Sequence, residues 1–308
     1  MAGMLRRIAL ISLLAAAASA QSIVLDVKGA IARNDFALGE NLIQRYKTAR
    51  GVTPEMIEAV SWLGRGALAA KQLDRADRYA AETRSLVIEE LKRRRFDSEA
   101  HLPLALGASI EVQAAVMTAR GDRDAAVAFL QRQIKTYWDT SIRARIQKNI
   151  HLLSLEGKPA PPLDLKAWLG PKPPTWEQLK GKTVLLFFWA HWCNDCKNLI
   201  PHIARVASEY RSKGLEVIGP TQHYGYVAGG VEAGREKETA YIESVRKQYY
   251  AALSQMPAPL SEENFRKYGS STSPTLVLVD RWGIVRLYHP GSMSYEELSA
   301  GVKSVLAD

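Results

Sequence analysis

The two cysteines of this chain stand three positions apart, at Cys193 and Cys196. The sequence has no third cysteine that could form a structural disulfide or help complete a four-thiolate metal site. The pair follows a continuous apolar run, residues 183–190, and precedes a helical pattern. A Cys-x-x-Cys sequence between a buried strand and a helix presents a reactive dithiol at the start of that helix. The pair therefore predicts an α/β domain with redox chemistry and no metal.

Residues 1–20 have the pattern of a secretory signal peptide. Arg6 and Arg7 supply the positive start, residues 8–18 form the apolar run, and Ala18-Ser19-Ala20 fits the small-x-small cleavage pattern. The apolar run is shorter than the roughly 17–25 residues of a membrane-spanning helix. We expect export by a cleavable signal peptide and a mature protein in the periplasm or outside the cell. The alternative is an uncleaved anchor.

The overall composition is typical of a globular chain, with 47% hydrophobic and 24% charged residues. The net charge of +9 favours solubility and a weak attraction to anions. The densest basic run, residues 92–95, has no interleaved aromatic residue. We interpret it as the solvated end of a helix, with a nucleic-acid or lipid patch as the alternative. We therefore expect no nucleic-acid partner.

Residues 21–155 predict an all-helical domain, because they contain little proline and much alanine, leucine, arginine and glutamate. Three polar turns precede the small residues Gly39, Ala76 and Ala126, which would let antiparallel helices approach closely. The pattern weakly resembles the tetratricopeptide repeat, although these residues lie 37 and 50 positions apart rather than 34. The domain is either a platform for partner docking or a helical bundle that packs on the second domain.

Residues 156–174 are a proline-rich linker that cannot continue a helix. The domain that follows, residues 175–308, alternates strands and helices in an α/β layer arrangement. The patterns predict strands over 183–190, 215–219, 274–280 and 284–289, and helices over 198–213, 236–253, 261–268 and 294–307.

Several separated elements of the second domain agree with one known family. They are the strand 184–188, the stretch 189–197 (Trp-Ala-His-Trp-Cys-Asn-Asp-Cys-Lys), the prolines of 159–161, Pro201, and Ser273-Pro274-Thr275. In order and spacing these residues resemble the thioredoxin superfamily, most of all its exported TlpA/ResA-type thiol–disulfide oxidoreductases. The resemblance covers roughly residues 157–308. It implies an α/β thioredoxin-like domain, with a central mixed sheet flanked by helices, after the all-α domain of helical hairpins.

The resemblance also implies the roles of the site residues. Cys193 would be the solvent-facing nucleophile at the helix tip, where the dipole favours a thiolate. Cys196 would be the resolving thiol, and the two would close a redox disulfide. Pro274 would follow a cis peptide bond and expose the backbone of Ser273 to an extended substrate, with Trp192 as an apolar rim. The partners would be protein disulfides and an electron-donor thiol reductase, such as a membrane-bound one; no cofactor is implied.

The chain departs from the family where a proton acceptor for Cys196 is expected. Phe187 and Leu199 occupy the positions at which relatives carry an aspartate or a glutamate. His191 and Asp195 are candidates by proximity, with water as the alternative. Asn194 and Asp195 separate the cysteines, and a carboxylate there disfavours a neighbouring thiolate. We therefore predict a reductant of low potential rather than a strong oxidase.

The stretch 223–256 is longer than a minimal thioredoxin needs, and its glycines predict a mobile loop. It is either a lid that selects substrates or an ordinary surface insertion. Two other functions remain open for the chain. One is a peroxide-reducing enzyme on the same fold, although the Pro and Thr that such enzymes place before their cysteine are missing. The other is a scaffold protein that works through the helical domain.

Overall fold

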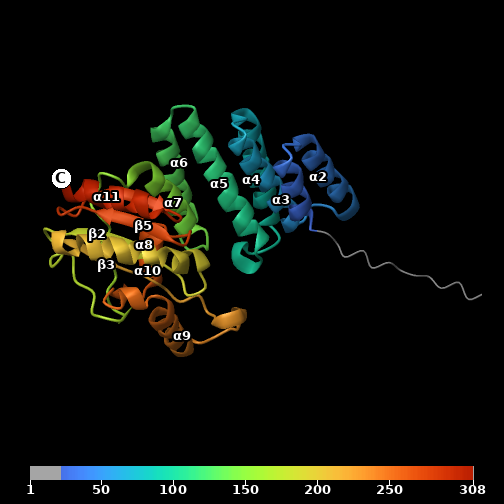
Figure 1. Cartoon of the computed structure of the whole chain (residues 1–308). Coiled ribbons are helices and arrows are strands. Elements are labelled where there is room, and N and C mark those ends of the chain that lie inside the picture. The colour runs from blue at the N-terminus through green and yellow to red at the C-terminus, as the bar shows by residue number, and fades with distance from the viewer. Residues whose placement is uncertain (1–21, 308) are drawn as a thin grey trace, which may run out of the picture.

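The computed structural model describes residues 22–307, so the predicted signal peptide lies outside the described residues. Figure 1 shows two parts in chain order, a helical part coloured from blue to green and an α/β part coloured from yellow-green to red. The helical part contains α1 Ile23–Ala32, α2 Phe36–Arg50, α3 Pro54–Ala69, α4 Leu73–Glu90, α5 His101–Ala119, α6 Arg123–Thr136 and α7 Arg143–Ser154.

The first six helices pair as hairpins, α1 with α2, α3 with α4, and α5 with α6. The turns at these three places share one geometry, with Asn34, Lys71 and Gly121 in the left-handed region at φ of 56°, 58° and 91°. In each turn the next residue donates its backbone N–H to the carbonyl five positions earlier. A Cβ on Gly39 would lie 2.8 Å from the side chain of Leu63, so glycine permits the close approach of α2 to α3. The helical-hairpin prediction is confirmed, whereas the tetratricopeptide likeness stays a prediction.

The helix α5 lies at the centre of the helical part. It is long and apolar enough to cross a membrane, but more than half of it is buried against neighbouring helices. It contacts α3 and α4 on one side and α6 and α7 on the other. A helix covered on several sides has to be apolar around most of its circumference. Its composition therefore follows from its position in the core.

The α/β part is a mixed sheet covered by helices. In the described residues its strands have the order β3-β2-β5-β6, with β2 parallel to β3 and antiparallel to β5. A small second sheet pairs β1 Trp168–Leu169 with β4 Ala258–Pro259. The other elements are β2 Thr183–Phe188, α8 Asn194–Tyr210, β3 Leu215–Ile218, α9 Arg235–Tyr249, α10 Glu262–Tyr268, β5 Thr275–Val279, β6 Val285–Pro290 and α11 Tyr295–Ala307.

The strand β2 is buried along its whole length, as its continuous apolar run predicts. Leu185 and Phe187 face one core, which also receives apolar residues of α8 and α11. Phe188 faces the other core, where it packs against Phe265 and Tyr268 of α10. The predicted fold class, a thioredoxin-like α/β domain after an all-α domain, is confirmed.

The two parts join where α7 packs on α10 and β6. The backbone carbonyl of Lys267 lies 2.8 Å from Nε2 of His151, and burial lowers the pKa of this histidine. Gly269, at φ of 60°, brings its backbone so close to α7 that a Cβ would collide with the backbone of Lys148. The proline-rich linker is held as well, since the N–H of Gly157 donates to the carbonyl of Val285 over 2.8 Å. The domain boundaries at 155 and 174 stay predictions.

Some predicted element ends are wrong by a few residues. The helix after the cysteines begins at Asn194 rather than 198, because Cys193 caps it. The helix predicted over 236–253 ends at Tyr249, and a separate 3-10 turn covers Ala251–Leu253. Pro201 lies inside α8, where a proline removes one backbone hydrogen bond of the helix.

Candidate active site

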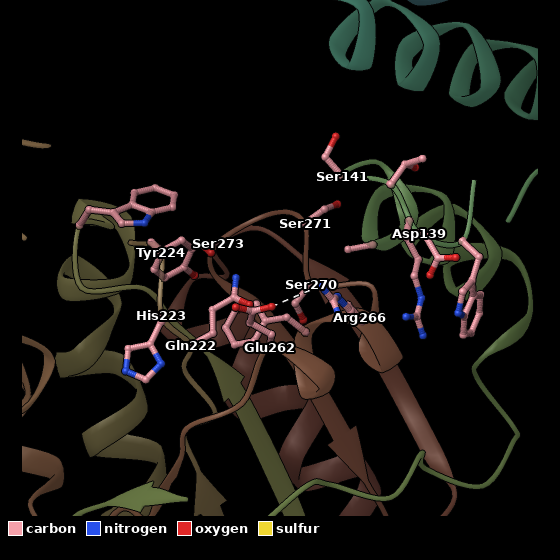
Figure 2. A pocket seen from close by; sticks show the side chains of 16 residues that line it. Asp139, Ser141, Gln222, His223, Tyr224, Glu262, Arg266, Ser270, Ser271 and Ser273 are labelled. Carbon is pink, nitrogen blue, oxygen red and sulfur yellow. Dashed lines mark hydrogen bonds and ion pairs between the residues drawn. The ribbon is translucent and has the colours of Figure 1, made fainter. Parts of the chain in front are cut away.

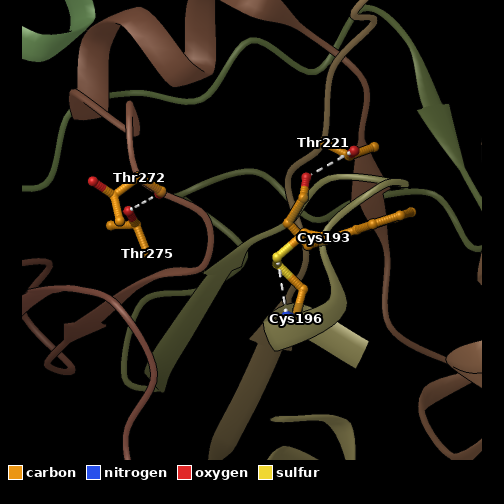
Figure 3. Close-up of a disulfide and its surroundings, with 6 residues drawn as sticks. Cys193, Cys196, Thr221, Thr272 and Thr275 are labelled. Atoms are coloured by element: carbon orange, nitrogen blue, oxygen red, sulfur yellow. Dashed lines mark hydrogen bonds between the residues drawn. A yellow bond between two sulfur atoms is a disulfide. The ribbon is translucent and has the colours of Figure 1, made fainter. Parts of the chain in front are cut away.

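The two cysteines lie at the N-terminus of α8, directly after the central strand β2. They form a disulfide, and the Sγ of Cys193 accepts a hydrogen bond from the backbone N–H of Cys196 over 3.0 Å (Figure 3). Cys193 is the N-cap residue, so its sulfur occupies the place where a serine or aspartate oxygen usually satisfies a free backbone N–H. This position also lies at the positive end of the helix dipole.

Both sulfurs are withdrawn from solvent. Cys196 is fully buried and Cys193 is only 3% exposed. The prediction of a solvent-facing Cys193 is therefore wrong for the disulfide form, in which Cys193 packs in the apolar core that contains Trp189 and Cys196. Trp192 is the exposed residue of this loop, at 46%. Trp189, in contrast, is fully buried and donates its indole N–H to the carbonyl of Gly219.

The second predicted element of the site is the loop before β5. Its Ser273–Pro274 peptide bond is cis, as the resemblance implies. The hydroxyl of Thr275 donates to the carbonyl of Thr272 over 2.7 Å and closes the turn (Figure 3). Ser273 and Trp192 line the same cavity, whereas Pro274 is not among its lining residues. The structure thus brings together two of the three residues predicted to bind substrate.

A buried carboxylate beside His191 was not predicted from the sequence. Nε2 of His191 lies 3.3 Å from Oε1 of Glu238, and each side chain is 1% exposed. The carboxylate of Glu238 also accepts the backbone N–H groups of Tyr224, over 2.5 Å, and Gly225, over 3.0 Å. Burial lowers the pKa of His191, although the charge of Glu238 opposes that shift.

Three tyrosine rings surround His191 edge-on. The ring centroids of Tyr224, Tyr226 and Tyr241 lie 5.4, 5.3 and 5.3 Å from the imidazole. Together with Glu238 they fasten the inserted stretch to the residue two positions before Cys193. Residues of the insertion therefore pack directly against the loop that carries the two cysteines. The sequence offers one signal for this packing. Three tyrosines, Tyr224, Tyr226 and Tyr241, occur close to the acidic residue Glu238.

The remaining predicted residues lie on the surface or in the core. Asn194 and Asp195 are exposed in the first turn of α8. Phe187 is fully buried and Leu199 is 2% exposed, so the two positions that carry acids in relatives are apolar core here. No group of three His, Cys, Asp or Glu side chains suited to a metal ion occurs in the part of the chain that the structure describes.

A cavity of about 610 Å³ opens beside the disulfide loop (Figure 2). Trp192, Tyr224 and Ser273 form one side of it, and residues 138–144 of the helical part form the other. In Figure 2, Tyr224 and Ser273 stand opposite Asp139 and Ser141, with Ser270, Ser271 and Arg266 between them. The cavity is thus shared by both parts of the chain.

The fold and the site together define a class of protein. A disulfide at the N-terminus of the helix after the central strand, together with a cis-proline loop before the neighbouring strand, is the arrangement of a thioredoxin-fold protein with a Cys-x-x-Cys pair. Residues 157–288 match the model of the AhpC/TSA family. The helical part lies outside the matched residues.

Curated relatives agree with this class. Over 158 residues the chain is 30% identical to Protein DipZ of Mycobacterium bovis, a match that spans 47% of this chain and 20% of DipZ. Over 131 residues it is 26% identical to thiol-disulfide oxidoreductase ResA of Bacillus cereus, across 42% of this chain and 66% of ResA. A solved thiol:disulfide interchange protein from Chlorobium tepidum is 22% identical, with a TM-score of 0.39, and covers 48% of this chain and 97% of its own. The chain thus spans only a fifth of the length of DipZ.

Proposed function

We propose that this protein is a thiol–disulfide oxidoreductase that exchanges disulfides with protein substrates through Cys193 and Cys196. The observation that carries this proposal is the disulfide at the N-cap of α8, with a backbone N–H pointing at the sulfur of Cys193 over 3.0 Å. The same N–H and the helix dipole would stabilise a thiolate on Cys193 in the reduced protein. The names of the curated relatives support the same reaction.

The exchange takes two steps, each with one sulfur as nucleophile. The thiolate of Cys193 attacks a substrate disulfide, forms a mixed disulfide, and releases one substrate sulfur as a thiolate. Cys196 then loses its proton and attacks the Sγ of Cys193. The mixed disulfide breaks, the second substrate sulfur leaves and takes up a proton, and the Cys193–Cys196 disulfide forms. Two electrons pass to the substrate, so a donor dithiol has to reduce the protein again.

The other predicted residues act around this exchange. Trp192, Ser273 and Pro274 bind the substrate chain next to Cys193. His191 and Asp195 are the candidate proton acceptors for Cys196, and the buried contact with Glu238 supports His191. The signal-peptide pattern of residues 1–20 supports export, with action in the periplasm on protein disulfides and reduction by a thiol reductase such as a membrane-bound one.

The reduction of insulin disulfides by dithiothreitol tests the proposal. We expect the full chain to accelerate the reaction and the Cys193→Ser variant to fall to the uncatalysed rate, because its one remaining thiol, that of Cys196, is fully buried and cannot reach a substrate disulfide. An inactive wild-type protein, or a Cys193→Ser variant that keeps its activity, would contradict the proposal. Consumption of hydrogen peroxide that depends on Cys193 would favour the peroxidase alternative.

A further inference from the structure

The shared cavity has two walls from parts of the chain that lie far apart in sequence. One wall is the α6–α7 connection with the start of α7, residues 138–144, and the other carries Trp192 and Ser273 beside the disulfide. We propose that this cavity binds an extended polypeptide segment of the substrate protein, and that residues 138–144 and Ser270 recognise its backbone. The inference rests on the proposed function, and it assigns residues 138–144 of the helical domain to substrate binding.

The first argument is that polar atoms in this cavity lack partners. Ser270 is 5% exposed, and within residues 22–307 its Oγ has no hydrogen-bond partner. The side chain of Arg143 is 11% exposed, and its Nε is likewise without a partner among the described residues. Buried donors and acceptors are nearly always paired, because leaving them unpaired destabilises the fold. Both residues line the cavity, so a small rotation of either side chain would bring its unpaired atom to a polar group of an occupant.

The second argument is that the charged groups of the cavity are largely compensated. Nη2 of Arg266 lies 3.3 Å from Oε2 of Glu262, and the two are joined by a dashed line in Figure 2. Nη2 of Arg143 lies 3.7 Å from Oε1 of Glu263, and its guanidinium stacks 3.4 Å above the ring of Trp138. A phosphate or a nucleic acid would need uncompensated cations.

The lining also carries neutral hydroxyls, of which those of Thr140 and Ser141 already donate within the chain, to the carbonyl of Tyr137 and to Oδ1 of Asp97. They belong to five residues of the lining: Thr140, Ser141, Ser270, Ser271 and Ser273. A hydroxyl both donates and accepts a hydrogen bond. An extended peptide offers one N–H and one C=O per residue, so its backbone complements such walls without carrying charge.

The third argument is the position of two exposed tryptophans. Trp192 is 46% exposed next to Cys193, and Trp138 is 49% exposed on the wall from the helical part. Aromatic side chains supply large contact areas in recognition sites. A segment that crosses the cavity would therefore meet one aromatic residue on each wall, with its disulfide near Cys193.

The wall from the helical part is held in place, which suits recognition better than opening and closing. The hydroxyl of Ser141 donates to Oδ1 of Asp97 over 2.5 Å. Directly beyond Ser141, α7 packs on α10, and its His151 lies 2.8 Å from the carbonyl of Lys267. The distance between the two walls is thus fixed by the joint of the two parts.

The test measures binding of the S-alkylated insulin B chain, which cannot exchange disulfides, to the full-length oxidised protein. We expect Ser270→Ala and Arg143→Met each to weaken binding about three- to tenfold, the effect of one or two lost hydrogen bonds. Ser270→Ala should leave thermal stability unchanged or raise it, because it removes an unpaired buried hydroxyl. The matched controls are Ser109→Ala, whose buried hydroxyl bonds the carbonyl of Ala80, and Arg145→Met, whose guanidinium pairs with Glu111.

The outcomes separate this inference from the proposed function. If the wild-type protein does not bind the alkylated chain, or if both variants bind it as the wild type does, the inference is wrong. Equal losses in the controls would also overturn it, because the effect would then be structural. If binding depends on Ser270 and Arg143 but insulin disulfides are not reduced, the peptide site stands and the proposed function fails.

Discussion

The joint of the two parts and the dithiol loop each bury a histidine, but the partners of the two histidines differ. At the joint, His151 faces a neutral backbone carbonyl, that of Lys267. In the dithiol loop, His191 faces the carboxylate of Glu238, and both groups are withdrawn from water. A neutral partner is sufficient to hold two parts together. His191 lies two residues before Cys193 and burial lowers its pKa, and groups with perturbed pKa values cluster at functional sites.

The largest effect is expected at the joint. Gly269→Ala would force a Cβ into the backbone of Lys148 at a positive φ, so we expect a loss of about 2–4 kcal/mol in the free energy of unfolding. Gly283→Ala is the matched control, because Gly283 also has a positive φ but faces open space. It should lose about 1 kcal/mol in urea unfolding. Equal losses at the two glycines would mean that the close approach at the joint does not contribute to stability.

The next effect is expected in the dithiol loop. Glu238→Gln would leave at least one of the two backbone N–H groups, of Tyr224 and Gly225, without its acceptor. We expect the free energy of unfolding to fall by about 1–3 kcal/mol. Glu236→Gln on the exposed side of the same helix should change it by less than about 0.5 kcal/mol. If the two variants were equally stable, the hydrogen bonds that Glu238 accepts from Tyr224 and Gly225 would not stabilise the insertion.

Acidification acts on both histidines in the same direction. Burial lowers the pKa of His151 and of His191, so below about pH 6.5 the unfolded chain binds protons that the folded chain does not. The free energy of unfolding should therefore fall as the pH drops from 7 to 5.5, by at most about 1.4 kcal/mol per pH unit for each histidine. The His151→Gln variant should show a shallower dependence, and an unchanged slope would assign the effect to other groups.

The smallest effect is expected from Asp195. This carboxylate is exposed, so water screens its repulsion of a thiolate on Cys193. We expect Asp195→Asn to raise the reduction potential of the disulfide by roughly 5–20 mV, measured by equilibration with glutathione. The variant Glu209→Gln, at an exposed position far along α8, is the control and should have the potential of the wild type. No shift, or a lower potential in Asp195→Asn, would remove this argument for a reductant.

Local sequence was sufficient for one half of the site and not for the other. The strand β2, the cysteine pair and the Ser273–Pro274 loop each carry a pattern within a few neighbouring residues, and all three were found. Glu238 and Arg143 look like ordinary helix residues in the sequence. Their importance comes from packing, because α9 brings Glu238 to His191 and α7 brings Arg143 to the cavity. Contacts between elements that lie far apart in the chain cannot be predicted from the local pattern of one sequence.

The same limit explains why Cys193 was predicted to face solvent. A helix N-terminus is usually exposed, and the sequence indicates no cover for it. In the structure Cys193 belongs to the apolar core around Trp189 and Cys196, and Trp192 takes the exposed position instead. In the disulfide form a substrate would therefore meet the exposed ring of Trp192 before the sulfur of Cys193.

The most direct test of the account is a trapping experiment with the Cys196→Ser variant. Without the resolving thiol, reaction with native insulin, whose disulfides are intact, should stop at a mixed disulfide. Mass spectrometry of the digested complex should then find an insulin cysteine bonded to Cys193. The double variant Cys193→Ser with Cys196→Ser should trap nothing. If the single variant forms no covalent complex, or forms it as readily with S-alkylated insulin, the chain does not exchange disulfides through Cys193.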